Sequence, residues 1–165
     1  MHIVRKNHYS SIELYHWLLG HLLLYSKVLV PVDGSENSNR ALKHALSLSS
    51  KLKSKLTILY VLEIPPFVYV QSQKIVDSAM ASLEKEAKSI LDMAQNQAKE
   101  FDVEYETTLL KGDNTASIII DYNKRNDFDI IVIGSRGHGK FKTTLLGSVS
   151  NSVLHHSKNP VLIIK

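Results

Sequence analysis

Residues 129–140 read DIIVIGSRGHGK, an apolar run that ends in a loop with three glycines. A short run that is apolar at nearly every position is typical of a strand buried on both faces of a sheet. Comparable runs stand at residues 27–32, 56–62 and 160–164. Such strands need helices on both sides, so this stretch and its relatives predict an α/β domain.

The segments between these runs have helical periodicity. Apolar residues recur three and four positions apart within residues 37–52, 75–98, 116–122 and 149–154. Residues 103–108 alternate in the manner of a half-exposed strand. Five strands separated by four helices require right-handed crossovers. We therefore predict a single domain over residues 27–165, with a five-stranded parallel, doubly wound sheet in the order 3-2-1-4-5 and helices on both faces.

The composition is that of an ordinary single domain. The chain has 165 residues, of which 44% are hydrophobic and 22% charged. It has no cysteine, which excludes disulfides, zinc–thiolate sites and thiol nucleophiles. The formal net charge of +4 is scattered rather than gathered in a dense Lys/Arg run, so we expect no nucleic-acid partner.

The first 26 residues differ from the rest. Their apolar part, residues 12–25, is interrupted by His16, Gly20 and His21, and it is shorter than the roughly 20 residues of a membrane span. No A-x-A-like cleavage site follows it. We interpret residues 1–26 as a dispensable extension or an over-long gene start. The alternatives are an accessory helix that packs on the domain or a partner, and membrane association.

The loop that begins at Gly134 has the features of an anion-binding site. Its glycines let the backbone approach a ligand and adopt positive φ, and its successive N–H groups form a concavity for an anion. Ten residues after Gly137, the sequence GSVS at residues 147–150 opens a predicted helix. The free N–H groups and positive dipole end of a helix start make a second anion site. Two anion sites beside one strand end suit a polyphosphate.

Each feature also has a purely structural interpretation. The glycines can form a tight turn, and Ser148 can be a helix cap. His138 is interpreted as a loop residue, because the sequence marks no partner carboxylate for it. The spacing from Gly134 to Lys140 fits the phosphate-binding pattern G-x-x-x-x-G-K, but Phe141 stands where that pattern needs Ser or Thr for magnesium. We expect Lys140 and Lys142 to offset phosphate charge.

The pattern Gly134-x2-Gly137-x9-Gly147-Ser148, with VPVDGSE at residues 30–36 and PVLII at 160–164, resembles the universal stress protein family. The resemblance covers about residues 27–165. It implies the ATP-binding branch, because the branch that does not bind ATP lacks these glycines. It also implies an adenine-nucleotide alpha-hydrolase-like fold and a cytoplasmic stress-response protein.

The resemblance also assigns roles to residues. Asp33 meets the ribose or adenine and is a possible ligand of Mg²⁺ bound with ATP. The backbone of Val61 faces the adenine. Gly134 and Gly137 approach the ribose and phosphates. The nucleotide-binding residues expected in this way are Pro31, Val32, Asp33, Val61, Gly134, Ser135, Arg136, Gly137, Gly147, Ser148, Val149 and Ser150.

Three functions remain open at this point. The first is an ATP-binding regulatory module, and the second is a slow ATPase or phosphotransferase. The third is an oligomeric scaffold without bound nucleotide. The sequence offers no clear general base, so we expect no catalytic residue and at most weak ATP hydrolysis. We also expect a homodimer paired through the edge strand Val161–Ile164, which is apolar on both faces, and an unidentified protein partner.

Overall fold

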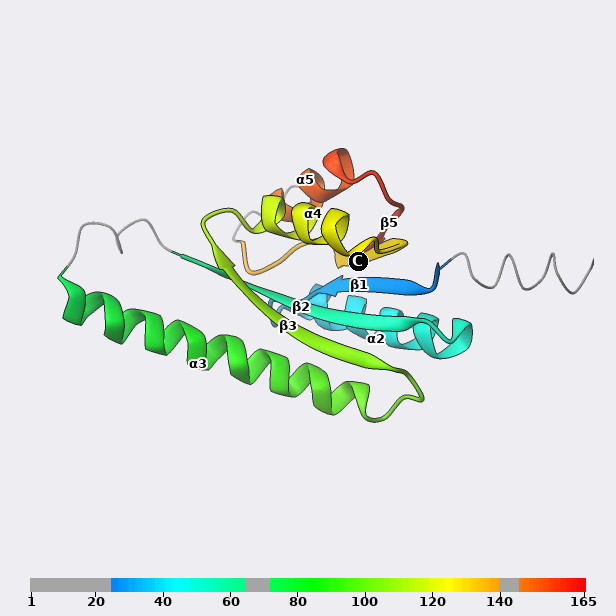
Figure 1. Ribbon diagram of the computed structural model, residues 1–165, viewed down its shortest axis with the longest axis horizontal. Helices are drawn as coiled ribbons and strands as arrows, with labels where there is room; N and C mark the ends of the chain where they lie inside the picture. Colours follow the sequence, from blue (N-terminus) through cyan, green and yellow to red (C-terminus); the bar gives the residue numbers. More distant parts are fainter. Residues whose placement is uncertain (1–24, 65–71, 140–145) are drawn as a thin grey trace, which may run out of the picture.

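A computed structural model describes residues 25–64, 72–139 and 146–165. Its five-stranded sheet has the order β3-β2-β1-β4-β5, and every strand pair is parallel. Both the sheet order and the alternation of strands and helices predicted from the sequence are confirmed. Figure 1 shows the sheet between two layers of helices. The elements are β1 (Lys27–Pro31), α2 (Glu36–Leu52), β2 (Lys55–Glu63), α3 (Gln73–Ala98), β3 (Tyr105–Gly112), α4 (Thr115–Asn126), β4 (Ile130–Gly134), α5 (Ser148–His156) and β5 (Val161–Ile164).

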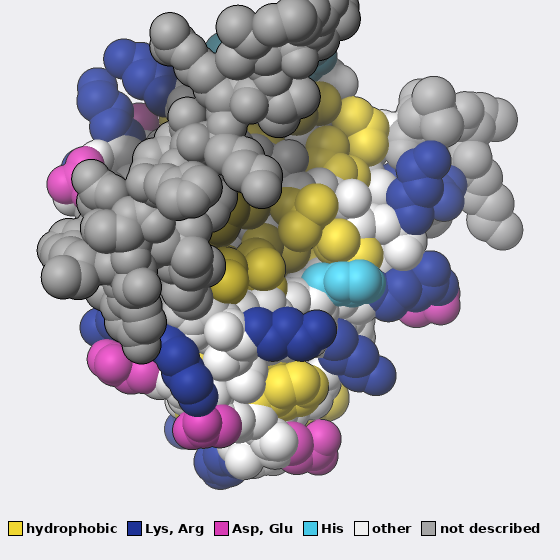
Figure 2. Space-filling model, turned by 90° about the vertical axis from the view of Figure 1, so that its right-hand side faces the viewer, with side chains coloured by type: hydrophobic (Ala, Val, Ile, Leu, Met, Phe, Trp, Pro, Cys, Tyr) yellow, Lys and Arg dark blue, Asp and Glu magenta, His cyan; other side chains and the backbone are white. Residues whose placement is uncertain are grey.

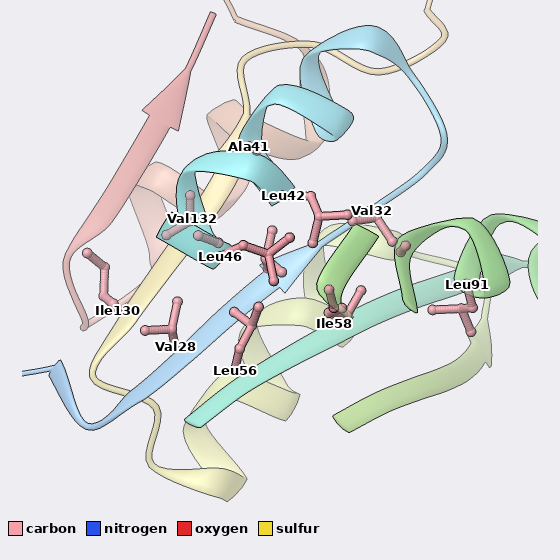
Figure 3. Packing of buried hydrophobic residues seen from close by; sticks show 14 residues of the cluster. Val28, Val32, Ala41, Leu42, Leu46, Leu56, Ile58, Leu91, Ile130 and Val132 are labelled. Carbon is pink, nitrogen blue, oxygen red and sulfur yellow. The ribbon is translucent and has the colours of Figure 1, made fainter. Parts of the chain in front are cut away.

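The alternation of side chains along the strands produces two cores. Val28 and Val30 of β1 point to the face covered by α2 and α3, where they meet buried residues of both helices, such as Leu42 and Leu91 (Figure 3). Leu29, between those two valines, points to the opposite face, which α4 and α5 cover. Because β1 is buried on both faces, it lies at the centre of the molecule and holds the loop that follows it in place.

Local signals set the ends of the elements that approach the carboxyl edge of the sheet. Pro31 is the last residue of β1, as its missing N–H predicts. Four residues later stands Ser35, the N-cap of α2, whose side chain accepts a hydrogen bond from the N–H of Ser38 at 3.2 Å. At its other end α2 stops at Leu52, and the C-cap residue Lys53 adopts left-handed geometry with φ 55°. These signals direct the β1–α2 loop over the end of the sheet.

The residues just before β1 contact the domain at the amino edge of the sheet. Tyr25 packs against the core under α2 and α3, and the hydroxyl of Ser26 donates to Asp129 at 2.8 Å. Tyr25 and Ser26, just before the predicted boundary at Lys27, thus contact the domain, and the prediction for the extension before them stays a prediction because residues 1–24 lie outside the described part. Figure 2 shows this side, where hydrophobic side chains gather near the middle and charged side chains of both signs surround them. Within the described residues, every helix is too short or too polar to span a bilayer.

Candidate functional site

A cavity of about 860 Å³ opens at the carboxyl ends of β1 and β4. These strands are neighbours, and the order of the sheet reverses between them, which is where open α/β sheets bind their ligands. The volume of the cavity is within the roughly 300–1,000 Å³ that is typical of small-molecule sites. All but two of the predicted binding residues line it, namely Pro31, Val32, Asp33, Gly134, Arg136, Gly137, Gly147, Ser148, Val149 and Ser150.

Val61 and Ser135 are the two predicted residues that do not line the cavity. Val61 lies in β2 opposite Leu110 of β3, and its side chain packs with the core under α4 and α5. Ser135 is 1% exposed, and its buried hydroxyl has no hydrogen-bond partner among the described residues. Lys140 and Lys142, which we expected to offset phosphate charge, lie outside the described residues.

The carboxylate of Asp33 rests in space that Gly137 leaves open. A Cβ atom at Gly137 would lie 2.2 Å from Oδ2 of Asp33, which is far inside contact distance. The other oxygen, Oδ1, accepts a hydrogen bond from the N–H of Ser35 at 3.0 Å. Gly137 is therefore a glycine because the Asp33 side chain occupies the position of its Cβ. The contact joins the loops after β1 and β4.

The other two glycines of the pattern have different surroundings. A Cβ at Gly134 would lie 2.7 to 2.9 Å from backbone atoms of Asn37 and Ser38, so this glycine permits the close approach of α2 to β4. A Cβ at Gly147 would meet nothing closer than 3.4 Å. Positive φ, which we expected for the loop glycines, occurs among the described glycines only at Gly34, with φ 83°. The expectation is therefore wrong for Gly134, Gly137 and Gly139, and Gly147 likewise has an ordinary φ of −75°.

The start of α5 presents unpaired donors to the cavity. Gly147 is the N-cap, so the interpretation of Ser148 as the cap is wrong, and Gly147 has no side chain with which to cap this helix. The Gly147 N–H does not face the cavity as a free donor, because it donates to the carbonyl of Ser135 at 2.8 Å. The N–H groups of the next three residues, Ser148 to Ser150, have no partner within the helix. The Ser148 side chain is exposed, and the first turn carries no acidic residue.

His138 and Ser38 line the cavity although neither was among the predicted binding residues. The Nε2 atom of His138 lies 2.9 Å from the carbonyl oxygen of Asp33, so His138 holds the loop after β4 against the loop after β1. The two residues are 105 positions apart, and no local pattern indicates this contact. The Ser38 hydroxyl donates to the Ser35 carbonyl at 3.0 Å, which is an ordinary contact in a first helical turn.

The charged side chains that line the cavity include Asp33 and Arg136. Asp33 is the only acidic side chain among the described lining residues. The field of Asp33 reaches β2: burial raises the pKa of Tyr60, and the nearby carboxylates of Glu86 and Asp33 raise it further. The described residues contain no group of three or more His, Asp or Glu side chains that could hold a metal ion. Asp33 is thus the one described side chain in the cavity that can offer a carboxylate to a cation.

The fold and the cavity define a doubly wound α/β protein with its cleft at the point where the strand order reverses. The sequence model of the universal stress protein family matches residues 24–165. The chain belongs to the universal stress protein family.

Several members of the family align with most of this chain. Universal stress protein YxiE of Bacillus subtilis is 34% identical over 150 residues, which cover 86% of this chain and 100% of YxiE. Universal stress protein MJ0531 of Methanocaldococcus jannaschii is 30% identical over 142 residues, covering 86% of this chain and 83% of its own. A crystal structure of a universal stress protein in complex with cAMP aligns with TM-score 0.62 and 26% identity, covering 85% of this chain and 96% of that one. At least one family member of this fold thus binds an adenine nucleotide.

Proposed function

We propose that this protein binds ATP, together with Mg²⁺, in the cavity between β1 and β4, and that it acts as a nucleotide-dependent regulatory module in a stress response. The observation that carries the proposal is the pairing of two anion-binding segments across one cavity. On one side lies the glycine loop after β4, and on the other lies the uncapped start of α5. Unpaired N–H groups at the positive end of a helix dipole favour a phosphate group.

Asp33 supplies the other half of the proposed site. Oδ1 of Asp33 is engaged by the Ser35 N–H, whereas Oδ2 makes no hydrogen bond within the described residues. A carboxylate oxygen of this kind can accept a hydrogen bond from a ribose hydroxyl or contact Mg²⁺ held by the phosphates. The complex of a relative with cAMP supports an adenine nucleotide as the ligand. Two anion-binding segments can hold more than one phosphate, which favours ATP over a monophosphate as the ligand.

Calorimetric titration with ATP, ADP, AMP and cAMP, each with and without Mg²⁺, tests the proposal. We expect ATP with Mg²⁺ to bind most tightly. Ser148→Ala removes one hydroxyl that can donate to a phosphate, which costs about 1.5–3 kcal/mol, so ATP affinity falls roughly tenfold to a hundredfold. The matched control is Ser152→Ala, on the same helix but outside the cavity. A wild-type protein that binds none of these nucleotides at millimolar concentration would refute the proposal.

The edge strand β5 supports a proposal about assembly. We infer that two copies pair through β5, which ends the sheet and is four residues long. Leu162 is 40% exposed there, and an unprotected apolar edge invites another strand. Leu162→Lys places a charge at the edge and should give monomers in light scattering. Leu154→Lys, at a residue 42% exposed on α5, is the matched control. Monomeric wild-type protein at micromolar concentration would contradict this inference.

A further inference from the structure

The hydroxyl of Ser150 is already engaged inside the protein. Ser150 is 2% exposed although it borders the cavity. Its Oγ donates to the carbonyl of Ser135 at 2.8 Å and lies 3.1 Å from the carbonyl of Gly147. A hydroxyl has one hydrogen to donate, and two backbone carbonyls surround the one at Ser150.

The carbonyl of Ser135 connects three elements. It accepts both the Ser150 hydroxyl and the N–H of Gly147, each at 2.8 Å. The N–H of Ser135 itself donates to the carbonyl of Ile164 in β5 at 2.6 Å. The start of α5 is therefore attached to the loop after β4, and that loop is attached to the edge strand. These bonds set the distance between the two anion-binding segments.

A phosphate oxygen at neutral pH accepts hydrogen bonds from a hydroxyl and does not donate them. Ser150 could contact a phosphate only by turning its hydrogen away from the Ser135 carbonyl. That rotation would weaken a buried contact, whereas the exposed Ser148 hydroxyl is free to donate without any such loss. The two serines of the first turn of α5 thus have different tasks.

We propose that Ser150 is a positioning residue, which holds the start of α5 against the loop after β4 so that Ser148 and the helix N–H groups meet the phosphates. The Ser150 hydroxyl does not itself contact the nucleotide, although the backbone N–H of Ser150 is one of the helix donors that do. This inference replaces the direct phosphate contact expected for Ser150 from family resemblance, and it rests on the proposed nucleotide site.

The first measurement needs no nucleotide. Amide hydrogen exchange of the free protein, followed residue by residue by NMR, compares the wild type with Ser150→Ala. Loss of the Ser150 hydroxyl loosens the start of α5, so the Gly147 amide, which shares the Ser135 carbonyl, should exchange roughly tenfold faster. Ser152→Ala is the control and should leave this rate unchanged. A Gly147 amide that exchanges at the wild-type rate in Ser150→Ala overturns the proposal, because a mere ligand contact has no effect in the free protein.

The second measurement is ATP binding in a double-mutant cycle. Ser150→Ala should weaken ATP roughly tenfold, and Ser148→Ala should cost much less affinity in the Ser150→Ala background than in the wild type, because a displaced helix start no longer presents Ser148 correctly. If the fold-losses of ATP affinity in the two single variants simply multiply in the double variant, the two serines contact the ligand independently, and the proposal is overturned.

A pair of variants of the same shape separates the hydroxyl from packing. Ser150→Thr keeps the donor and should retain slow Gly147 exchange and ATP affinity close to the wild type, whereas Ser150→Val lacks the donor and should lose both. Equal behaviour of the two variants would overturn the proposal. If the wild type binds no nucleotide, the proposed function fails by itself, while the exchange measurement still decides whether Ser150 holds the start of α5.

Discussion

The loop after β4 and the start of α5 both bring glycines to one cavity, but the glycines are there for different reasons. In the loop, a side chain at Gly134 would collide with the backbone of α2, and one at Gly137 would collide with Asp33. At the start of α5, Gly147 has ordinary φ and room for a Cβ. Gly134 permits packing, Gly137 makes room for the Asp33 side chain, and Gly147 is required by neither contact nor φ in the free protein.

The largest effect is expected at Gly134. In Gly134→Ala the new methyl group must push against the backbone of Asn37 and Ser38, at 2.7 to 2.9 Å, which cannot move without shifting α2. Overpacking of this kind costs about 1–3 kcal/mol of unfolding free energy. Urea denaturation followed by circular dichroism measures it. A variant within about 0.5 kcal/mol of the wild type would show that α2 and β4 tolerate a larger separation.

Gly137→Ala should affect binding more than stability. The atom in its way, Oδ2 of Asp33, ends a side chain with two rotatable bonds, so the carboxylate can move without unfolding the domain. Its displacement removes a hydrogen bond between a charged group and the nucleotide, and ATP affinity should fall roughly tenfold to a hundredfold.

The control for Gly137→Ala is the same change in an Asp33→Ala background. There the collision is absent, so Gly137→Ala should have little further effect on ATP affinity in calorimetric titration. An undiminished effect would mean that the Gly137 backbone itself, rather than the position of Asp33, limits the approach of the nucleotide.

Gly147→Ala should be the mildest of the three changes. The nearest atom to the new Cβ, Cα of Arg136, is 3.4 Å away, and φ −75° suits any residue. Alanine is a poorer N-cap than glycine, so about 0.5 kcal/mol of stability should be lost, with little change in ATP affinity. A loss of binding as large as that of Gly137→Ala would show that the nucleotide itself occupies the space beside Gly147.

The smallest effect on stability and on ATP affinity is expected from a substitution at the opposite, amino edge of the sheet. This edge serves as a reference for the loop after β4 and the start of α5. There Glu106 pairs with Lys55 at 2.8 Å. A hydrogen bond from Lys55 lowers the pKa of Glu106, and the same bond raises the pKa of Lys55. The contribution of Glu106 is thus present above its unfolded-state pKa and is lost as the pH falls through its folded-state pKa. That of Lys55 is present below its unfolded-state pKa and is lost as the pH rises through its higher folded-state pKa.

Both side chains are more than 40% exposed, so the pair should contribute little. Glu106→Gln should lower the melting temperature slightly at pH 7, and the difference should shrink as the pH falls through the lowered folded-state pKa of Glu106, because the wild-type carboxylate is then protonated. ATP affinity at pH 7 should equal that of the wild type, because the pair lies at the amino edge. A change in affinity would show that the two edges of the sheet are coupled.

The amino-acid sequence by itself determined the class of fold and most members of the candidate site. The apolar runs such as residues 129–133 specify strands buried on both faces, and the spacing of the helical segments between them requires parallel crossovers. The glycine spacing from Gly134 to Gly147 marked the loops that line the cavity. These signals can be read because they depend on neighbours within a few residues along the chain.

Only the tertiary structure decided what the individual residues do. It placed Oδ2 of Asp33 beside Gly137, α2 against Gly134, and His138 on the Asp33 carbonyl. It also turned the Ser150 hydroxyl inward to Ser135 and left Val61 outside the cavity wall. The partners in the Asp33 contacts stand about 100 residues apart and meet because parallel strands carry their carboxyl ends to one edge. Contacts between such distant segments depend on how the whole chain packs, so no local pattern of residues can specify them.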